Sequence, residues 1–197
     1  GHDRRGHARD ARAQRSGVII TLGNTPMTLV RGIRTSLRVY EYECTEQISS
    51  RVTPLLALLQ ARGALTPAEA AIARREVARG IGVLLGRQRA DGGIGYWSAG
   101  DWTTPWLTAY AANVIIEAKE LGVPVDSAAL ARLSEYVRGA PREEPKDRGP
   151  LQWWYGRRST RLADQVAAVD FLSRAGQADR PAENELLRNA PFMLRED

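Results

Sequence analysis

The feature that most constrains the fold of this chain is a series of helix-length segments with their own start and stop signals. The clearest start is Thr66-Pro67-Ala68-Glu69, where Thr66 and Glu69 can form a capping box and Pro67 takes the first helical position. The clearest stops are Gly122 and Gly176, each of which closes an apolar run that carries a basic residue near its end. These signals predict helices over 45–61, 67–88, 105–121, 126–138 (capped by Asp126) and 159–175, with a last helical stretch from about Pro181. We expect the first of them to be interrupted near Pro54.

The segment before these helices has a different character. Residues 17–24 are rich in β-branched side chains and end in Gly-Asn, which predicts a short extended lead-in. Residues 29–40 carry apolar side chains at four-residue spacing, which favours an amphipathic helix, although alternation over 33–40 also fits a strand. Residues 1–16 hold five Arg and two Asp, and we expect a disordered basic tail. The chain is therefore predicted to consist of this tail and one folded unit over 17–197.

Two of the predicted helices resemble each other. Residues 105–122 and 162–176 both place small and apolar side chains along a helix, followed by a basic residue and a Gly. Helices of ten to twenty residues with short polar links and no convincing sheet predict an all-α fold. Helical hairpins repeated in this way commonly stack into a solenoid or close into a toroid. We therefore expect antiparallel helical pairs.

Charge and composition exclude several classes of function. The net charge is +5, but residues 1–16 supply +3 of it, and acidic and basic residues are interspersed over the rest. That pattern is typical of solvated helix faces, so we expect no nucleic-acid partner. His2 and His7 both lie in the tail, so the folded part offers no His-based metal site or acid–base chemistry, and no cofactor is predicted. No apolar stretch is long enough to span a membrane.

Cys44 is the single cysteine, so it is either an inert buried side chain or a reactive thiol. Its setting is the segment YEYECTEQISSR at residues 40–51. Residues i and i+3 face the same side of a helical turn, so the Cys44 thiol can reach the side-chain carbonyl of Gln47. Attack of the thiolate on that carbonyl expels ammonia and leaves an internal thioester.

This segment resembles the thioester motif of the α2-macroglobulin and complement family, in particular of its bacterial members. The family motif is commonly written Tyr-Pro-Tyr-Gly-Cys-x-Glu-Gln followed by Ser-Arg and a Pro, and the chain has Tyr40, Tyr42, Cys44, Glu46, Gln47, Ser50, Arg51 and Pro54 in that order. The stretch GRQRADGGIGYWSAGDWTTPWLTAY at 86–110 also resembles the family's downstream segment. The likeness covers about residues 27–190. Glu41 and Glu43 depart from it, since Pro and Gly are usual there.

The resemblance implies a fold and a function. It implies that 17–197 is a partial thioester domain of a larger protein, with an incomplete α/α toroid, since the family's toroid has about twice as many helices. It implies a periplasmic or otherwise exported endopeptidase inhibitor that is not an enzyme, and whose membrane anchor would lie in an N-terminus outside this sequence. Other domains of the same protein would shield a thioester between Cys44 and Gln47 until a protease attacks. The exposed thioester would then capture the protease through its Lys amines. Tyr40 and Tyr42 would shield the bond, and Glu46 would shape the turn.

Two other interpretations stay open. Residues 88–97 (QRADGGIGYW) resemble a repeat of terpene cyclases, which are α/α-toroid enzymes. A helical scaffold that kept the fold and lost the thioester is favoured by Glu41 and Glu43. Complement-type relatives use a downstream His to favour hydroxyl targets; the chain has no His after His7, which favours direct attack by amines.

Overall fold

The computed structural model describes residues 43–139 and 158–192, and within them the chain is helical. The helices are α2 (Thr45–Gln60), α3 (Pro67–Gly86), α4 (Pro105–Glu120), α5 (Ser127–Gly139), α7 (Arg158–Arg174) and α8 (Arg180–Asn189), followed by the short 3-10 helix η2 (Ala190–Phe192). The described residues contain no β-strand, only an isolated bridge between Gln88 and Ile94. The all-α prediction is confirmed for this part of the chain. The basic tail, the extended lead-in at 17–24 and the segment 29–40 lie outside the described residues.

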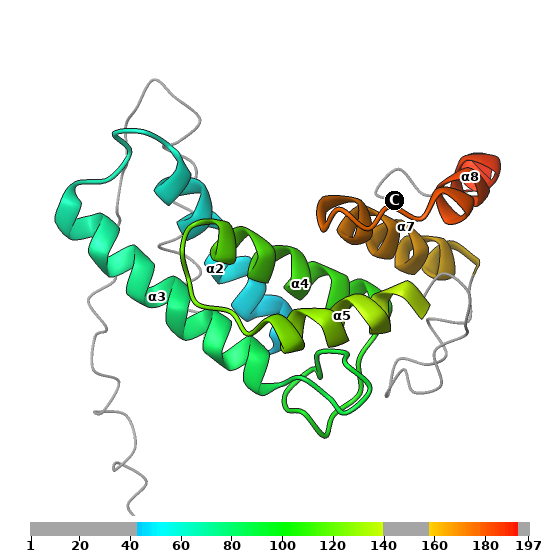
Figure 1. Ribbon diagram of the computed structural model, residues 1–197, viewed down its shortest axis with the longest axis horizontal. Coiled ribbons are helices and arrows are strands. Elements are labelled where there is room, and N and C mark those ends of the chain that lie inside the picture. Colours follow the sequence, from blue (N-terminus) through cyan, green and yellow to red (C-terminus); the bar gives the residue numbers. More distant parts are fainter. Residues whose placement is uncertain (1–42, 140–157, 193–197) are drawn as a thin grey trace, which may run out of the picture.

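Helix α4 lies at the centre of the arrangement and packs against α2, α3, α5 and α7. Figure 1 shows α2 antiparallel to α3 and α4 antiparallel to α5, with α8 packed on α7 at the far end. Because α2 and α3 run in opposite directions, the start of α2 and the end of α3 meet at the same end of the pair. None of the helices in residues 43–139 and 158–192 combines the length and apolar character that crossing a membrane requires.

The start signals act as predicted. Thr66 caps α3 with its side chain accepting from the Glu69 amide, Glu69 accepts from the Thr66 amide, and Pro67 opens the helix. Asp126 caps α5 by accepting from the Ala128 amide at 3.0 Å. Helix α3 ends two residues before the predicted boundary, because Gln88 already pairs with Ile94 in the next loop.

The predicted interruption near Pro54 is wrong, since α2 continues through this residue to Gln60. Pro54 lacks an amide donor, which costs a helix about 3 kcal/mol. The turn around it is buried in the core, with Leu55, Leu56 and Leu58 each at most 2% exposed. Full burial of such a side chain stabilises by about 1.5–3 kcal/mol, so the packing of this turn outweighs the lost hydrogen bond.

The two similar segments are α4 and α7 with the residues that end them, and these helices pack against each other. Both end in the same hydrogen-bond pattern, in which the amide after the Gly reaches back over the last turn: Val123 to the Ala118 carbonyl at 3.0 Å and Gln177 to the Leu172 carbonyl at 2.7 Å. Gly122 and Gly176 have φ of +86° and +70°, a conformation that glycine adopts without steric cost. The repeated sequence pattern therefore corresponds to a repeated structural unit.

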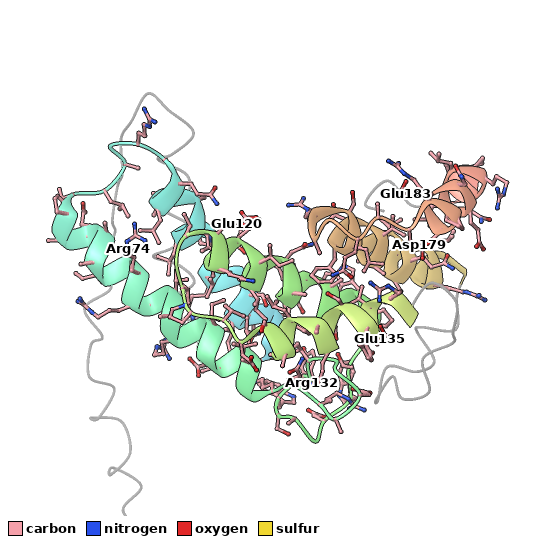
Figure 2. The ribbon with its side chains drawn as sticks, viewed as in Figure 1. Arg74, Glu120, Arg132, Glu135, Asp179 and Glu183 are labelled. Carbon is pink, nitrogen blue, oxygen red and sulfur yellow. The ribbon has the colours of Figure 1, made fainter. Side chains whose placement is uncertain are left out.

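The Gly-rich segment 87–104 links α3 to α4 and forms a compact turn at the lower edge of the view in Figure 1. Gln88 anchors it to α5, donating to the Ala129 carbonyl at 2.9 Å and accepting from Arg132 at 2.6 Å. Figure 2 shows Arg132 beside this segment. At its other side the turn lies against the first residues of α2, which brings it to the predicted reactive residues.

Candidate functional site at the start of α2

Cys44 and Gln47 form a reciprocal capping box at the first turn of α2. Cys44 is the N-cap residue, and its Sγ accepts from the Gln47 amide at 3.4 Å. In return, the Gln47 Oε1 accepts from the Cys44 amide at 3.1 Å. Cys44 is 1% exposed, and Gln47 is half-buried. The proximity predicted from their i, i+3 spacing is observed, and both side chains face the same side of the turn.

Thr45 attaches this turn to the Gly-rich segment. Its amide donates to the Tyr96 carbonyl at 2.9 Å, and its hydroxyl donates to the Gly95 carbonyl at 2.6 Å. Thr45 is fully buried, so both bonds are shielded from water. The residue next to Cys44 is thus held by a segment that lies fifty residues away in the sequence.

Arg87, the C-cap residue of α3, forms a second connection around Cys44. Its Nη2 donates to the Glu43 carbonyl at 2.6 Å, and its Nη1 donates to the Thr45 hydroxyl at 3.2 Å and to the Tyr96 carbonyl at 3.3 Å. Burial lowers the pKa of the Arg87 guanidinium, and the negative charges that Cys44 and Glu43 can carry partly offset this effect. The guanidinium therefore bridges the residues on both sides of Cys44.

Three aromatic side chains of the Gly-rich segment pack against one another. Tyr96 stacks on Trp102 with ring centroids 4.5 Å apart, and Trp97 meets Tyr96 edge-on at 5.3 Å. The Tyr96 amide donates to the Trp102 carbonyl at 2.9 Å, so the backbone that binds Thr45 is itself held by a hydrogen bond. Trp97 is 49% exposed. The part of the chain that the structure describes contains no group of three His, Cys, Asp or Glu residues suited to a metal ion.

No family model matches the chain. Over 123 residues it is 34% identical to the alpha-2-macroglobulin of Escherichia coli K12, a match that covers 60% of this chain and 7% of the E. coli protein. The fold matches the crystal structure of Salmonella alpha-2-macroglobulin reacted with methylamine, with a TM-score of 0.69 and 28% identity over 82% of this chain and 11% of that one. The chain is homologous to the bacterial alpha-2-macroglobulins. It also matches trypsin-activated E. coli alpha-2-macroglobulin, with a TM-score of 0.61 and 25% identity over 76% of this chain and 10% of that one.

This alpha-2-macroglobulin homologue spans about a tenth or less of the length of these relatives, in agreement with the predicted partial copy. Of the predicted supporting residues, Glu46 is exposed in the first turn of α2, where a negative charge interacts favourably with the helix dipole. Tyr40 and Tyr42 lie outside the described residues, as does Glu41.

Glu43 departs from the usual Gly of the motif without visible backbone strain. Every positive φ among the described residues belongs to a glycine. The Glu43 carboxylate accepts from Arg51 at 2.7 Å and lies 3.9 Å from Arg79. The hydrogen bond from Arg51 lowers the pKa of Glu43 despite partial burial. The side chain that a Gly would lack is therefore held in an ion pair at the edge of the site.

Sequence reasoning missed Thr45 and Arg87. Thr45 occupies the variable position of the motif, and Arg87 is one of several Arg residues near the end of α3. Their contacts depend on how the start of α2, the end of α3 and the Gly-rich segment meet, which no local pattern encodes. The only signal in the sequence was the resemblance of the stretch that begins at residue 86.

Proposed function

We propose that this chain is the thioester-bearing helical part of a bacterial alpha-2-macroglobulin-like endopeptidase inhibitor. In this function a thioester between Cys44 and Gln47 reacts with Lys amines of an attacking protease and attaches it covalently through Gln47. The bond is consumed by the reaction, so the chain acts as a single-use trap rather than an enzyme.

The observation that carries this proposal is the reciprocal capping box between Cys44 and Gln47. Helix N-caps are preferentially Ser, Thr, Asp or Asn, and sulfur is a weak acceptor, so Cys is a poor choice for capping alone. The same geometry places the Cys44 thiol and the Gln47 side-chain amide on one turn. A buried thiol beside a half-buried amide is what formation of an internal thioester requires.

The surroundings of Cys44 support a protected acyl group. A thioester survives only where water is excluded, and Cys44 is 1% exposed with a fully buried neighbour, Thr45. The Gly-rich segment is hydrogen-bonded to the start of α2 through Thr45. Gln47 itself is half-buried, so its exposed side would need a cover from outside the described residues.

The relatives support the choice of target. Two solved structures of homologues are described as reacted with methylamine and as activated by trypsin, which agrees with reactive amines and with proteases as partners. We infer that other domains of the same full-length protein complete the shielding of the bond. We infer an exported, periplasmic location from the same homology.

Intact mass of the full-length protein tests the proposal. Closure of the Cys44–Gln47 bond removes one ammonia, and treatment with methylamine should add one methylamine and free one thiol. A protein with the unclosed mass and a free thiol before treatment would reject the thioester and favour a scaffold that kept only the fold.

A further inference from the structure

Arg87 is held in a fixed position beside Cys44. Its guanidinium donates to the Glu43 carbonyl on one side of Cys44, to the Thr45 hydroxyl on the other, and to the Tyr96 carbonyl of the Gly-rich segment. A guanidinium is planar and presents its donors in a rigid fork, so three bonds in different directions determine its orientation. The site therefore contains a cation whose position is fixed by hydrogen bonds.

The charge of Arg87 is available to the site. All three hydrogen bonds go to neutral oxygens, whereas Arg51 and Arg79 face the carboxylate of Glu43. Glu46, the other acidic side chain of this turn, is exposed. The Arg87 guanidinium interacts electrostatically with Cys44 and, to a smaller extent, with the Glu43 carboxylate. Among the described charged groups around Cys44, Arg87 is thus suited to act on the sulfur.

We propose that Arg87 is a positioning residue for the thioester, which fixes the turn around Cys44 and stabilises negative charge on Cys44 Sγ. This inference rests on the proposed function and names a residue that promotes its chemistry.

The charge on Sγ matters in both directions of the reaction. When the bond forms, the thiolate attacks Gln47 Cδ, the C–N bond breaks, and the nitrogen leaves as ammonia with the proton of the thiol. When the bond opens, an amine attacks Cδ, the C–S bond breaks, the sulfur keeps the electron pair, and the amine loses a proton to water. A fixed cation near Sγ lowers the free energy of the thiolate in each case, without reorganisation during the reaction.

Two alkylating reagents of different charge test this role in the full-length protein after opening with methylamine. Iodoacetate is anionic and iodoacetamide is neutral, and both react with the thiolate. The ratio of their rate constants therefore reports the local charge and not the fraction of ionised thiol. A change that only loosens the structure alters both rates together, whereas loss of a nearby cation lowers the ratio.

The informative variants are Arg87→Gln and Arg87→Met, which remove the charge, and Arg87→Lys, which keeps it. Arg74→Gln is the matched control, because Arg74 lies on the same helix and donates to a backbone carbonyl, that of Leu121, at 3.1 Å. Figure 2 shows Arg74 near the other end of α3. We expect the ratio to fall about threefold in the neutral variants, as for loss of one charge in a largely aqueous environment. It should stay close to the wild-type value in Arg87→Lys and Arg74→Gln.

The outcomes separate this inference from the proposed function. If the wild-type mass shows a closed thioester but the ratio is unchanged in the folded neutral variants, the inference is overturned and the proposed function stands. If the wild-type protein has no thioester, the proposed function itself is rejected. If neither neutral variant folds, the wild-type protein decides: the ratio must fall as salt screens the cation, and a salt-independent ratio overturns the inference.

Discussion

Helices α2 and α3 both begin with a capping box, but the two boxes consist of different residues. At α3, the Thr66 hydroxyl accepts from the Glu69 amide at 3.3 Å and Glu69 accepts from the Thr66 amide at 2.8 Å, in an exposed position. At α2, Cys44 and Gln47 make the same pair of bonds at 3.4 and 3.1 Å, with Cys44 buried. Thr and Glu are the residues that capping alone favours. The buried box at α2 departs from them and has instead the Cys–Gln pair that the proposed thioester requires.

The largest difference between the two boxes should appear on removal of the N-cap side chain. We expect Cys44→Ala to abolish both methylamine incorporation and covalent protease capture, since the sulfur of the proposed thioester is lost. Thr66→Ala should leave both reactions unchanged and should lower the free energy of unfolding by about 1 kcal/mol. Intact mass and gel shift with trypsin measure the first effect, and denaturant unfolding measures the second. Residual amine uptake by Cys44→Ala would show that the reactive group lies elsewhere.

A second comparison of the two capping boxes replaces the third helical residue of each, which is Gln47 in α2 and Glu69 in α3. We expect Gln47→Glu to prevent thioester formation, because a carboxylate is a poor acyl donor to a thiol without activation. The helix cap should persist in this variant, since the new carboxylate would accept from the Cys44 amide as Glu69 accepts from the Thr66 amide. Stability should stay within about 0.5 kcal/mol of wild type, as it should for Glu69→Gln, which keeps full reactivity. A large loss of stability in Gln47→Glu would indicate that its effect on reactivity is structural.

The two boxes also show how far sequence could predict this molecule. The helix starts at Thr66 and Asp126 and the proximity of Cys44 to Gln47 follow from spacings of two or three residues, and all are observed. The break expected at Pro54 is absent, because burial of the surrounding turn is a tertiary effect that the local rule omits. Thr45 and Arg87 could not be assigned, because their roles depend on contacts between distant segments.

A smaller effect is expected when different nucleophiles are compared for their rate of reaction with the proposed thioester of the α2 site. We expect methylamine to react far faster than glycerol, because the chain has no His after His7 to form an acyl-imidazole or activate a hydroxyl. Intact mass after matched incubations measures both rates, with Cys44→Ala as the blank. Equal coupling of glycerol and methylamine would contradict this selectivity and point to a His from another part of the full-length protein.

The smallest expected effect concerns the residue before each N-cap, which is Glu43 at α2 and Leu65 at α3. The hydrogen bond from Arg51 lowers the pKa of Glu43 below its ordinary value in the folded state. The ionised carboxylate therefore stabilises the fold above the ordinary pKa of Glu, and this contribution is lost as the pH falls through the lower folded value.

Glu43→Gln should then reduce stability near neutral pH and have no effect at a pH below the folded pKa of Glu43. Because the Glu43 side chain is 46% exposed, solvent screening limits the effect to about 0.5 kcal/mol. Thermal unfolding of both proteins between neutral and acidic pH measures the difference, and Glu120→Gln corrects for the loss of one surface charge; Glu120 lies at the far end of α4 (Figure 2). Amine uptake should be retained, because the backbone carbonyl of Glu43 still accepts from Arg87. A variant that unfolds normally but no longer closes its thioester would instead assign the Glu43 carboxylate a direct part in the α2 site, which the Leu at the corresponding position of α3 could not supply.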